Sequence, residues 1–326
     1  MLFEIKGLTK NFGGLTAVND LNLQMEKNEL VGLIGPNGAG KTTVFNLVTG
    51  IYQPTAGTVR LEEKDITGLP PHEIGRLGIA RTFQNLRLFR GLSVIQNVTT
   101  ATQLQYDYGF ISVLFRAPIF RKQEREIRDK AMEYLDMVGL ADQWNSKAGS
   151  LPYGLQRKLE IARALALSPK LLLLDEPAAG MNPDESLDLM DMIQGLRKQL
   201  DLTILVIEHH MELVMGICER IVVLNFGATI ATGTPAEIQA NPEVITAYLG
   251  EDTDEFDDYD DEPSGTGASQ GVVSQAVVYG ADVFRDGVAQ GDVSQGEVSQ
   301  AEVSHAEGSQ DVISQADNFQ EGRRRR

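Results

Sequence analysis

The run GPNGAGKTT, residues 35–43, lies between the apolar run LVGLI and the helix-forming stretch VFNLVTG. Its spacing matches the phosphate-binding loop, in which glycines let consecutive backbone N–H groups converge on phosphate oxygens. The N-terminus of the helix that follows adds partial positive charge. We therefore predict a nucleotide site, with Lys41 at the β- and γ-phosphates and the Thr42 hydroxyl on Mg²⁺. The predicted contacts are Gly35, Pro36, Asn37, Gly38, Ala39, Gly40, Lys41, Thr42 and Thr43.

A pair of carboxylates ends a second apolar run, LLLLDEP, at residues 171–177. Four consecutive leucines predict a buried strand that delivers Asp175 and Glu176 at its carboxyl end, where ligands bind in open α/β sheets. We expect Asp175 to hold Mg²⁺, directly or through water, and Glu176 to polarise an attacking water. Such a pair is a weak signal alone, but together with the phosphate loop it indicates a hydrolytic site.

Two further polar residues fit this site. Gln84, in the stretch RTFQN, is placed to contact Mg²⁺ or the attacking water, although taken alone it is more typical of a surface loop. His209 follows the strand TILVIE and is placed to hydrogen-bond the γ-phosphate, although a single histidine there more often has a structural role. His209 and His210 are not expected to bind a metal together, because adjacent residues on a strand point apart.

The order of patterns along the chain indicates an α/β fold. Residues 1–82 are rich in the alternating or apolar runs that are typical of strands, and residues 94–138 are predicted to be helical. Residues 155–250 alternate between helices and apolar strands. This alternation implies parallel βαβ units that build one sheet.

Two of the expected helices carry specific signals. Asn182 and Pro183 place a capping residue and a first-turn proline at the start of a helix over residues 184–200. Within residues 94–138, a mostly apolar stripe recurs at helical spacing on a charged background. The stripe comprises Glu124, Ile127, Ala131, Leu135 and Val138.

Composition limits the possible functions. The 326 residues, 42% of them hydrophobic, suffice for one large domain or two with a packed core. Cys218 is the single cysteine, so there is no disulfide framework, in keeping with a reducing cytoplasm. The N-terminus lacks the apolar segment of a signal peptide, and no apolar run approaches the ~18 residues of a membrane span. Residues 1–249 carry a net charge of −4, so we expect no nucleic-acid partner.

The rest of the sequence differs from this region. Residues 250–326 carry a net charge of −13, and EDTDEFDDYDDE holds nine acidic residues in twelve, which should keep that segment extended. A period of five follows, with Val in the third position seven times from Val273 to Val303. The period partly resembles a pentapeptide-repeat β-helix, but a disordered tail fits the same composition. The final RRRR is expected to be a solvated terminus.

The order of these parts resembles the nucleotide-binding subunit of ABC transporters over about residues 1–250. The similarity to the LivG-like ATPases of branched-chain amino acid importers is carried by FGGLTAVNDLNL, GIARTFQN, LEIARAL, LLLDEPAAGMNP, EHHMELVMGICERIVVLNFG and NPEVITAYLG. It implies an α/β P-loop NTPase of ABC type, with a mixed core sheet, an N-terminal antiparallel β region and a helical subdomain inserted at about residues 86–150. The predicted domain is followed by an acidic linker at 251–270, five-residue repeats at 271–320 and a basic terminus at 321–326.

The resemblance also implies roles for single residues. Phe12 is similar to the aromatic residue that stacks on adenine, with Val18 beside it. Glu176 is similar to the catalytic base and His209 to the switch histidine, and Gln84 is similar to the residue that couples the site to the membrane subunits. The implied magnesium ligands are Thr42, Gln84 and Asp175, and the implied cofactors are ATP and Mg²⁺.

In this family a Leu-Ser-Gly-Gly-Gln signature begins a helix that closes on the γ-phosphate held by the partner's P-loop. Here LPYGL stands in that place and keeps only Leu151 and Gly154. Gly154 would let the helix N-terminus approach phosphate in trans, at a cost of ~1 kcal/mol of helix propensity relative to Ala. Pro152 removes a hydroxyl and an N–H, so we expect the helix-dipole contact to remain and the serine contact to be lost. Residues 178–182 match the D-loop between the two subunits.

We therefore predict an ATPase that powers solute movement through ATP-driven closure of a dimer. The implied partners are membrane-spanning permease subunits, a second copy of the chain or a second ABC ATPase, and indirectly a periplasmic or extracellular solute-binding protein. We expect the protein to be located at the cytoplasmic side of a bacterial inner membrane. The alternatives are urea import, lipopolysaccharide export, a non-transport ABC protein, or a scaffold built on the repeat tail. The intact Lys41, Asp175, Glu176 and His209 disfavour the scaffold.

Overall fold

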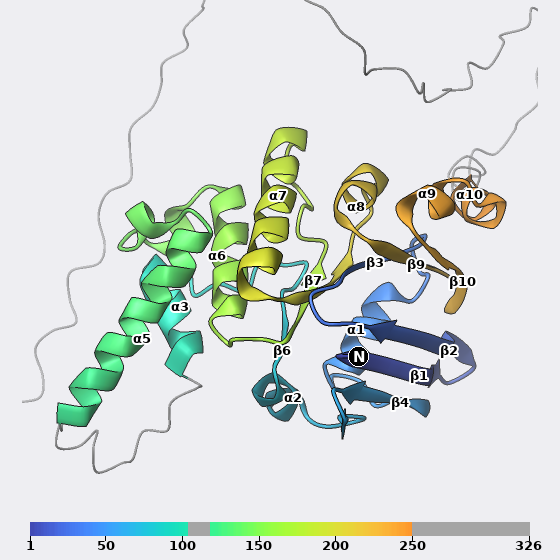
Figure 1. Ribbon diagram of the computed structural model, residues 1–326, viewed down its shortest axis with the longest axis horizontal. Helices are drawn as coiled ribbons and strands as arrows, with labels where there is room; N and C mark the ends of the chain where they lie inside the picture. Colours follow the sequence, from blue (N-terminus) through green and yellow to red (C-terminus); the bar gives the residue numbers. More distant parts are fainter. Residues whose placement is uncertain (104–117, 250–326) are drawn as a thin grey trace, which may run out of the picture. The chain divides into compact units, whose positions relative to one another are not determined.

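The structure, a computed structural model, describes residues 1–103 and 118–249 (Figure 1). The predicted linker, five-residue repeats and basic terminus lie outside these residues. The described part contains two sheets, one antiparallel and one mixed. The antiparallel sheet has the strand order β2-β1-β4-β5. Its strands are β1 (Phe3–Phe12), β2 (Leu15–Met25), β4 (Ala56–Leu61) and β5 (Lys64–Asp65).

The mixed sheet has the order β10-β9-β3-β8-β7-β6, in which only the edge strand β10 runs antiparallel to its neighbour. Strands β3, β7 and β8 are buried at every position, as expected for apolar runs covered on both faces. The predicted mixed core sheet and N-terminal antiparallel region are confirmed. The strands are β3 (Leu30–Ile34), β6 (Ile79–Arg81), β7 (Leu171–Asp175), β8 (Thr203–Ile207), β9 (Arg220–Asn225) and β10 (Ala228–Gly233).

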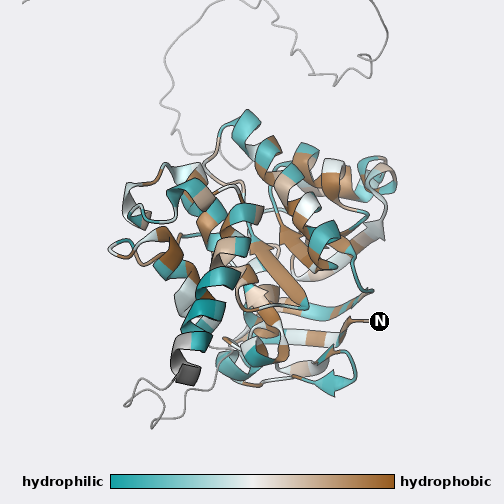
Figure 2. Ribbon diagram, turned by 60° about the vertical axis from the view of Figure 1, so that its left-hand side comes forward, coloured by the Kyte–Doolittle hydropathy of each residue, from teal (hydrophilic) through white to brown (hydrophobic). Residues whose placement is uncertain are grey.

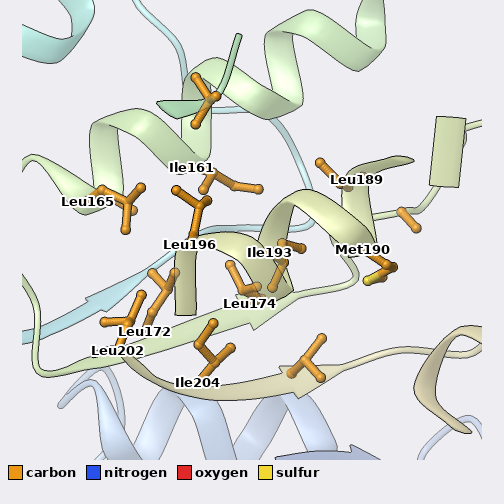
Figure 3. Close-up of a cluster of buried hydrophobic side chains, with 14 of the residues drawn as sticks. Ile161, Leu165, Leu172, Leu174, Leu189, Met190, Ile193, Leu196, Leu202 and Ile204 are labelled. Atoms are coloured by element: carbon orange, nitrogen blue, oxygen red, sulfur yellow. The ribbon is translucent and has the colours of Figure 1, made fainter. Parts of the chain in front are cut away.

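Alternate side chains of the central strands enter two different cores, because successive residues of a strand point to opposite faces. Leu171 and Leu173 of β7 join the core that holds helix α1 (Lys41–Val48) and the antiparallel sheet. Leu172 and Leu174 enter the core beneath the longer helices on the other face, where they meet residues of α6 (Tyr153–Leu165) and α7 (Pro183–Leu200), as Figure 3 shows. The mixed sheet is thus the middle layer.

The helical part between β6 and β7 contains α3 (Val94–Thr102), α5 (Pro118–Met137) and α6, with short 3₁₀ turns at Ala141–Gln143 and Ala148–Ser150. The predicted stripe on this part is confirmed for its four apolar members, which are buried. The inclusion of Glu124 was wrong, because its side chain is exposed. Figure 2 shows the hydrophilic outer side that α5 keeps toward solvent. The buried members are Ile127, Ala131, Leu135 and Val138.

The remaining helices flank the mixed sheet or follow its edge strand. Asn182 caps α7, whose first residue is Pro183, so the predicted start of this helix is confirmed. In the described part of the chain, no helix has both the length and the apolar character that a membrane crossing requires. The other helices are α2 (Pro71–Leu77), α8 (Met211–Ile217), α9 (Pro235–Gln239) and α10 (Pro242–Leu249).

Candidate nucleotide-hydrolysis site

The phosphate loop connects β3 to α1, and its glycines are required by the fold as well as by a ligand. Gly40, the N-cap of α1, has φ of 102°, and a Cβ there would lie 2.5 Å from the carbonyl oxygen of Ala17. Gly35 has φ of 147°, and a Cβ would lie 2.1 Å from the carbonyl oxygen of Leu224. Glycine is the residue that tolerates both conformations. The loop is therefore pressed against β2 and β9 before any phosphate binds.

Lys41 lies inside this loop rather than on its surface. Its side chain is buried, and Nζ donates to the carbonyl oxygens of Gly35 at 2.5 Å and Pro36 at 2.8 Å. A buried ammonium needs such acceptors, because burial of a charge without partners is costly. The first N–H groups of α1 receive no side-chain cap. The loop therefore presents backbone donors and a nearby positive charge, the chemistry that binds phosphate.

Asp175 at the end of β7 forms a buried ion pair that the sequence analysis missed. Nη2 of Arg81 lies 2.6 Å from Oδ2 of Asp175, and Nη1 donates to Oδ1 of Asn46 at 2.7 Å. The guanidinium also lies 5.4 Å from the ring centre of Phe45 and 5.0 Å from that of Phe83. Arg81 thus ties the end of β7 to α1. In sequence, it stood out only as a neighbour of Gln84.

The three predicted catalytic residues come together from three separate segments. Nε2 of Gln84 donates to Oε2 of Glu176 at 2.7 Å, and Nε2 of His209 contacts Oε1 of the same carboxylate. Glu176 has φ of 47°, a conformation that non-glycine residues rarely adopt. Its N–H donates to the carbonyl oxygen of Ile207 at 2.9 Å, which holds the strained residue against β8. The carboxylate is therefore positioned between an amide and an imidazole.

A second buried carboxylate, Glu208, supports this arrangement from beneath. Its Oε1 accepts from the N–H of Ala178 at 2.8 Å, and Oε2 accepts from the N–H of His209 at 3.3 Å. Burial raises the pKa of Glu208, while these two N–H groups act to lower it. The residue was missed because in sequence it looks like the end of a strand. It connects the segment after Glu176 to the backbone of the histidine.

The predicted catalytic residues and most of the phosphate loop line one pocket of about 550 Å³. The lining combines the phosphate loop, Gln84, Glu176 and His209 with the apolar Phe12, Leu15 and Phe226 and with residues from the start of β2. Among the predicted contacts, Gly35 and Pro36 do not line the pocket. The full lining is Phe12, Leu15, Thr16, Ala17, Asn37, Gly38, Ala39, Gly40, Lys41, Thr42, Thr43, Gln84, Glu176, His209 and Phe226.

Two other predicted site residues are not brought into the pocket of their own chain. Val18 is fully buried in the core beneath the phosphate loop, where its side chain lies 3.6 Å from the position of a Cβ at Gly40. It supports the loop from below, and Leu15, Thr16 and Ala17 line the pocket instead. Asp175 is likewise buried behind the pocket wall, paired with Arg81.

Gly154 lies in the first turn of α6 and is also absent from the pocket lining. A Cβ at this position would lie 3.2 Å from the end of the Met181 side chain and 3.7 Å from the Glu185 carboxyl group. The neighbouring Tyr153 donates its hydroxyl to the carbonyl oxygen of Ala179 at 3.0 Å. The start of α6 is therefore packed against the predicted D-loop.

Arg157, one turn further along α6, connects this packing to Gln84. Its guanidinium is buried and donates to the backbone oxygens of Phe83 at 2.8 Å and Gln84 at 2.5 Å. It also donates to the Tyr153 hydroxyl at 3.1 Å and pairs with Glu160 at 3.0 Å. No local sequence pattern indicates the contact with the loop of Gln84, since Phe83 and Gln84 lie more than 70 positions from Arg157. It links the signature helix to the loop of the predicted catalytic glutamine.

Comparison with known proteins agrees with this architecture. The family model "ABC transporter" matches residues 18–179, and the model "Branched-chain amino acid ATP-binding cassette transporter" matches residues 228–254. A crystal structure of an ATP-binding cassette of an ABC transporter, in its ADP conformation, is 30% identical with a TM-score of 0.67. The match covers 76% of this chain and 98% of that one. The chain belongs to the ABC transporter family, as one of its nucleotide-binding ATPases.

Two relatives indicate which subgroup of the family this chain resembles. The high-affinity branched-chain amino acid transport ATP-binding protein BraF of Pseudomonas aeruginosa is 51% identical over 250 residues. The corresponding protein LivG of Escherichia coli is 50% identical over 250 residues. Each match covers 77% of this chain and 98% of the relative. The resemblance stated from the motifs is thereby confirmed.

Proposed function

We propose that this ATPase energises the import of branched-chain amino acids through ATP-driven closure of two nucleotide-binding subunits. The cargo is inferred from the two relatives, whose names describe branched-chain amino acid transport. The dimer is inferred from one observation: Gly154 and the start of α6 do not line the pocket of their own chain. If the signature acts on phosphate, it acts on the phosphate held by another chain.

In this mechanism the pocket supplies the chemistry of hydrolysis. Glu176 accepts a proton from the attacking water, and Gln84 and His209 hold its carboxylate in position through their contacts with its two oxygens. Lys41 and the N–H groups of α1 stabilise the negative charge that develops on the phosphate oxygens. Phe12 stacks on adenine, and Gly154 of the second chain faces the γ-phosphate.

The residues proposed for magnesium form an oxygen donor set that suits this ion. Thr42 and Gln84 line the pocket, and Asp175 is fixed behind them by Arg81. Bound Mg²⁺ would neutralise phosphate charge. Asp175 would hold it directly or through water, with the hydroxyl of Thr42 and the amide oxygen of Gln84 as the other proposed ligands.

We further propose that the helical part binds the membrane-spanning permease. A groove of about 260 Å³ lies there, lined by Arg81, Phe89, Thr100, Ala101, Glu160, Arg163, Ala164 and Leu167. Phe89 is half exposed, and its ring lies 5.8 Å from the Arg163 guanidinium. The Glu160 carboxylate in the groove also accepts from the N–H of Arg87, in the loop that follows Gln84. A permease segment bound in this groove would thus contact the loop whose Gln84 reaches Glu176. The contact would lie at the cytoplasmic side of the membrane.

The decisive test is light scattering of the full chain carrying Glu176→Gln, with and without ATP and Mg²⁺. Loss of the general base should slow hydrolysis by a factor of about 10²–10⁴. The trapped ATP should convert the 35.7 kDa monomer into a dimer of twice that mass. Lys41→Met in the same background is the control, and it should stay monomeric because it lacks the phosphate contact.

If the variant binds ATP and stays monomeric, self-pairing is wrong and the site needs a different ATPase chain to complete it. The cargo is tested separately, by co-reconstituting the chain with its permease subunits and solute-binding protein in vesicles. ATP-dependent accumulation of radiolabelled leucine supports the proposal. Accumulation of urea and not leucine would reject it.

A further inference from the structure

The turn between β9 and β10 carries an aromatic residue to which neither the sequence analysis nor the proposed mechanism assigns a role. Phe226 lies in this turn, and its side chain is 87% exposed, the largest fraction among the exposed large apolar residues of the described chain. Its φ is 45°, a conformation that is unfavourable for a bulky side chain. An exposed ring on a strained backbone gives no folding advantage, because it buries little apolar surface. Its placement therefore points to a ligand.

The turn is fixed directly to the phosphate loop. The N–H of Gly227 donates to the carbonyl oxygen of Ala39 at 3.0 Å, and its own carbonyl accepts from the N–H of Asn19 at 2.8 Å. A Cβ at Gly227 would lie 2.8 Å from the carbonyl oxygen of Ala17, so the turn is closely packed there. These bonds give Phe226 a defined position relative to the phosphates. A loosely attached loop would not hold the ring in a fixed position.

Phe226 lines the same pocket as Phe12 and Leu15, which are 41% and 67% exposed. Three of the ten large apolar side chains exposed in the described residues thus surround one pocket. The phosphate loop lines that pocket as well. A ligand that suits both kinds of lining carries phosphates and a flat apolar group. A nucleotide has this form.

We propose that Phe226 is a second aromatic contact for the base of the bound nucleotide, in addition to Phe12. A ring against a nucleobase contributes affinity by stacking, and it does so for any base in proportion to its flat surface. The site therefore favours purine over pyrimidine nucleotides. Contact with the ring occurs in a single chain and does not require closure of the dimer.

The test uses Phe226→Asn in the full chain, because asparagine tolerates the left-handed conformation and removes the ring. Binding of ADP, UDP and pyrophosphate is measured by calorimetry with Mg²⁺, at protein concentrations where light scattering shows a monomer. We expect the affinity for ADP to fall about tenfold and the affinity for UDP to fall by a smaller factor. The affinity for pyrophosphate should change less than twofold. The Tm without nucleotide should rise, since the strain is relieved. Phe226→Tyr should keep the affinity for ADP.

Ile245→Ala is the matched control, because Ile245 is also exposed, at 45%, and does not line the pocket. It should leave all three affinities unchanged. Unchanged ADP binding in Phe226→Asn overturns the proposal. An equal loss for ADP and pyrophosphate also overturns it, since the turn would then act through the phosphate loop. Normal ADP binding with loss of the ATP-dependent dimer in the Glu176→Gln background would overturn it too, and would assign the ring to the contact between two copies.

Discussion

Helices α1 and α6 begin differently from helices α3, α7 and α9. The latter three each start with a capping box, in which an N-cap side chain and the residue three positions on satisfy two backbone N–H groups. The N-cap of α1 is Gly40 and that of α6 is Pro152, and neither gives its helix a side-chain cap. The capped ends are complete in themselves. At the other two ends, no N-cap side chain of the described residues accepts from the first N–H groups.

A missing cap does not identify a site by itself. The seven-residue helices α2 and α8 lack a side-chain cap as well. What distinguishes α1 and α6 is a glycine at the N-cap or in the first turn, in a sequence motif that matches a phosphate contact. They differ from each other in one respect: the start of α1 lines the pocket of its own chain, whereas Gly154 does not. This difference leads us to expect a second chain.

The largest effect is expected from Gly154→Asp in the Glu176→Gln background. An acidic residue near a helix start stabilises the helix by about 0.3–1 kcal/mol. Repulsion from Glu185, whose carboxyl carbon lies 3.7 Å from the new Cβ, opposes this gain. Folding stability should therefore change little, whereas the added charge repels phosphate. We expect loss of the ATP-dependent dimer by light scattering, with ATP binding to the monomer retained.

Gly195→Asp is the matched control for this charge change. Gly195 lies in the interior of α7 and is exposed, and a Cβ there would meet no heavy atom of the described residues within 4 Å. The variant should dimerise with ATP like its parent. If Gly154→Asp dimerises equally well, the start of α6 does not meet phosphate, and the distinction between α6 and the capped helices has no functional meaning.

The same contrast explains how much could be predicted from the sequence. Caps, the phosphate loop and buried strands are encoded in short consecutive runs, so the start of α7 and strands β3, β7 and β8 could be predicted. The pairs Arg81–Asp175 and Arg157–Gln84 join residues 94 and 73 positions apart, which no local pattern reports. The family resemblance implied that Val18 contacts the nucleotide beside Phe12. Strand alternation instead turns it into the core.

Pro152→Ser tests whether the altered signature weakens the contact in trans. In the single chain, a serine at the N-cap should stabilise α6 by about 1 kcal/mol. In the closed dimer its hydroxyl can donate to phosphate, and a hydrogen bond to a charged group contributes about 1.5–3 kcal/mol. Because the hydroxyl gives up the cap of the single chain when it donates to phosphate, the net gain is the difference between the two contributions. It predicts an ATP-dependent dimer that is roughly 3- to 30-fold tighter per site. The dimer affinity is measured by analytical ultracentrifugation in the Glu176→Gln background. An unchanged dimer would mean that position 152 does not reach phosphate.

A smaller effect is expected from Tyr153→Phe. This variant tests whether the Tyr153 hydroxyl stabilises the start of α6, which has no side-chain cap. The change removes the bond to the carbonyl oxygen of Ala179 and the acceptor for Arg157. Losing these two hydrogen bonds should cost about 1–2 kcal/mol of unfolding free energy in urea titrations. We also expect a lower kcat with little change in KM, because the D-loop loses its support. Equal stability and kcat would show that the hydroxyl contacts are dispensable.

The smallest effect on the dimer is expected at a helix start whose first N–H groups are satisfied by a capping box. Thr234 caps α9 by accepting from the N–H of Glu237, whose carboxylate in turn accepts from the N–H of Thr234. Thr234→Ala should cost about 1 kcal/mol of unfolding free energy. ATP binding and the ATP-dependent dimer should not change, because the box is satisfied within its own chain. A fall in dimer affinity with Thr234→Ala would show that capped ends also take part in closure. The affinity of the ATP-dependent dimer should therefore separate this end from the start of α6, where Gly154→Asp and Pro152→Ser are expected to change it.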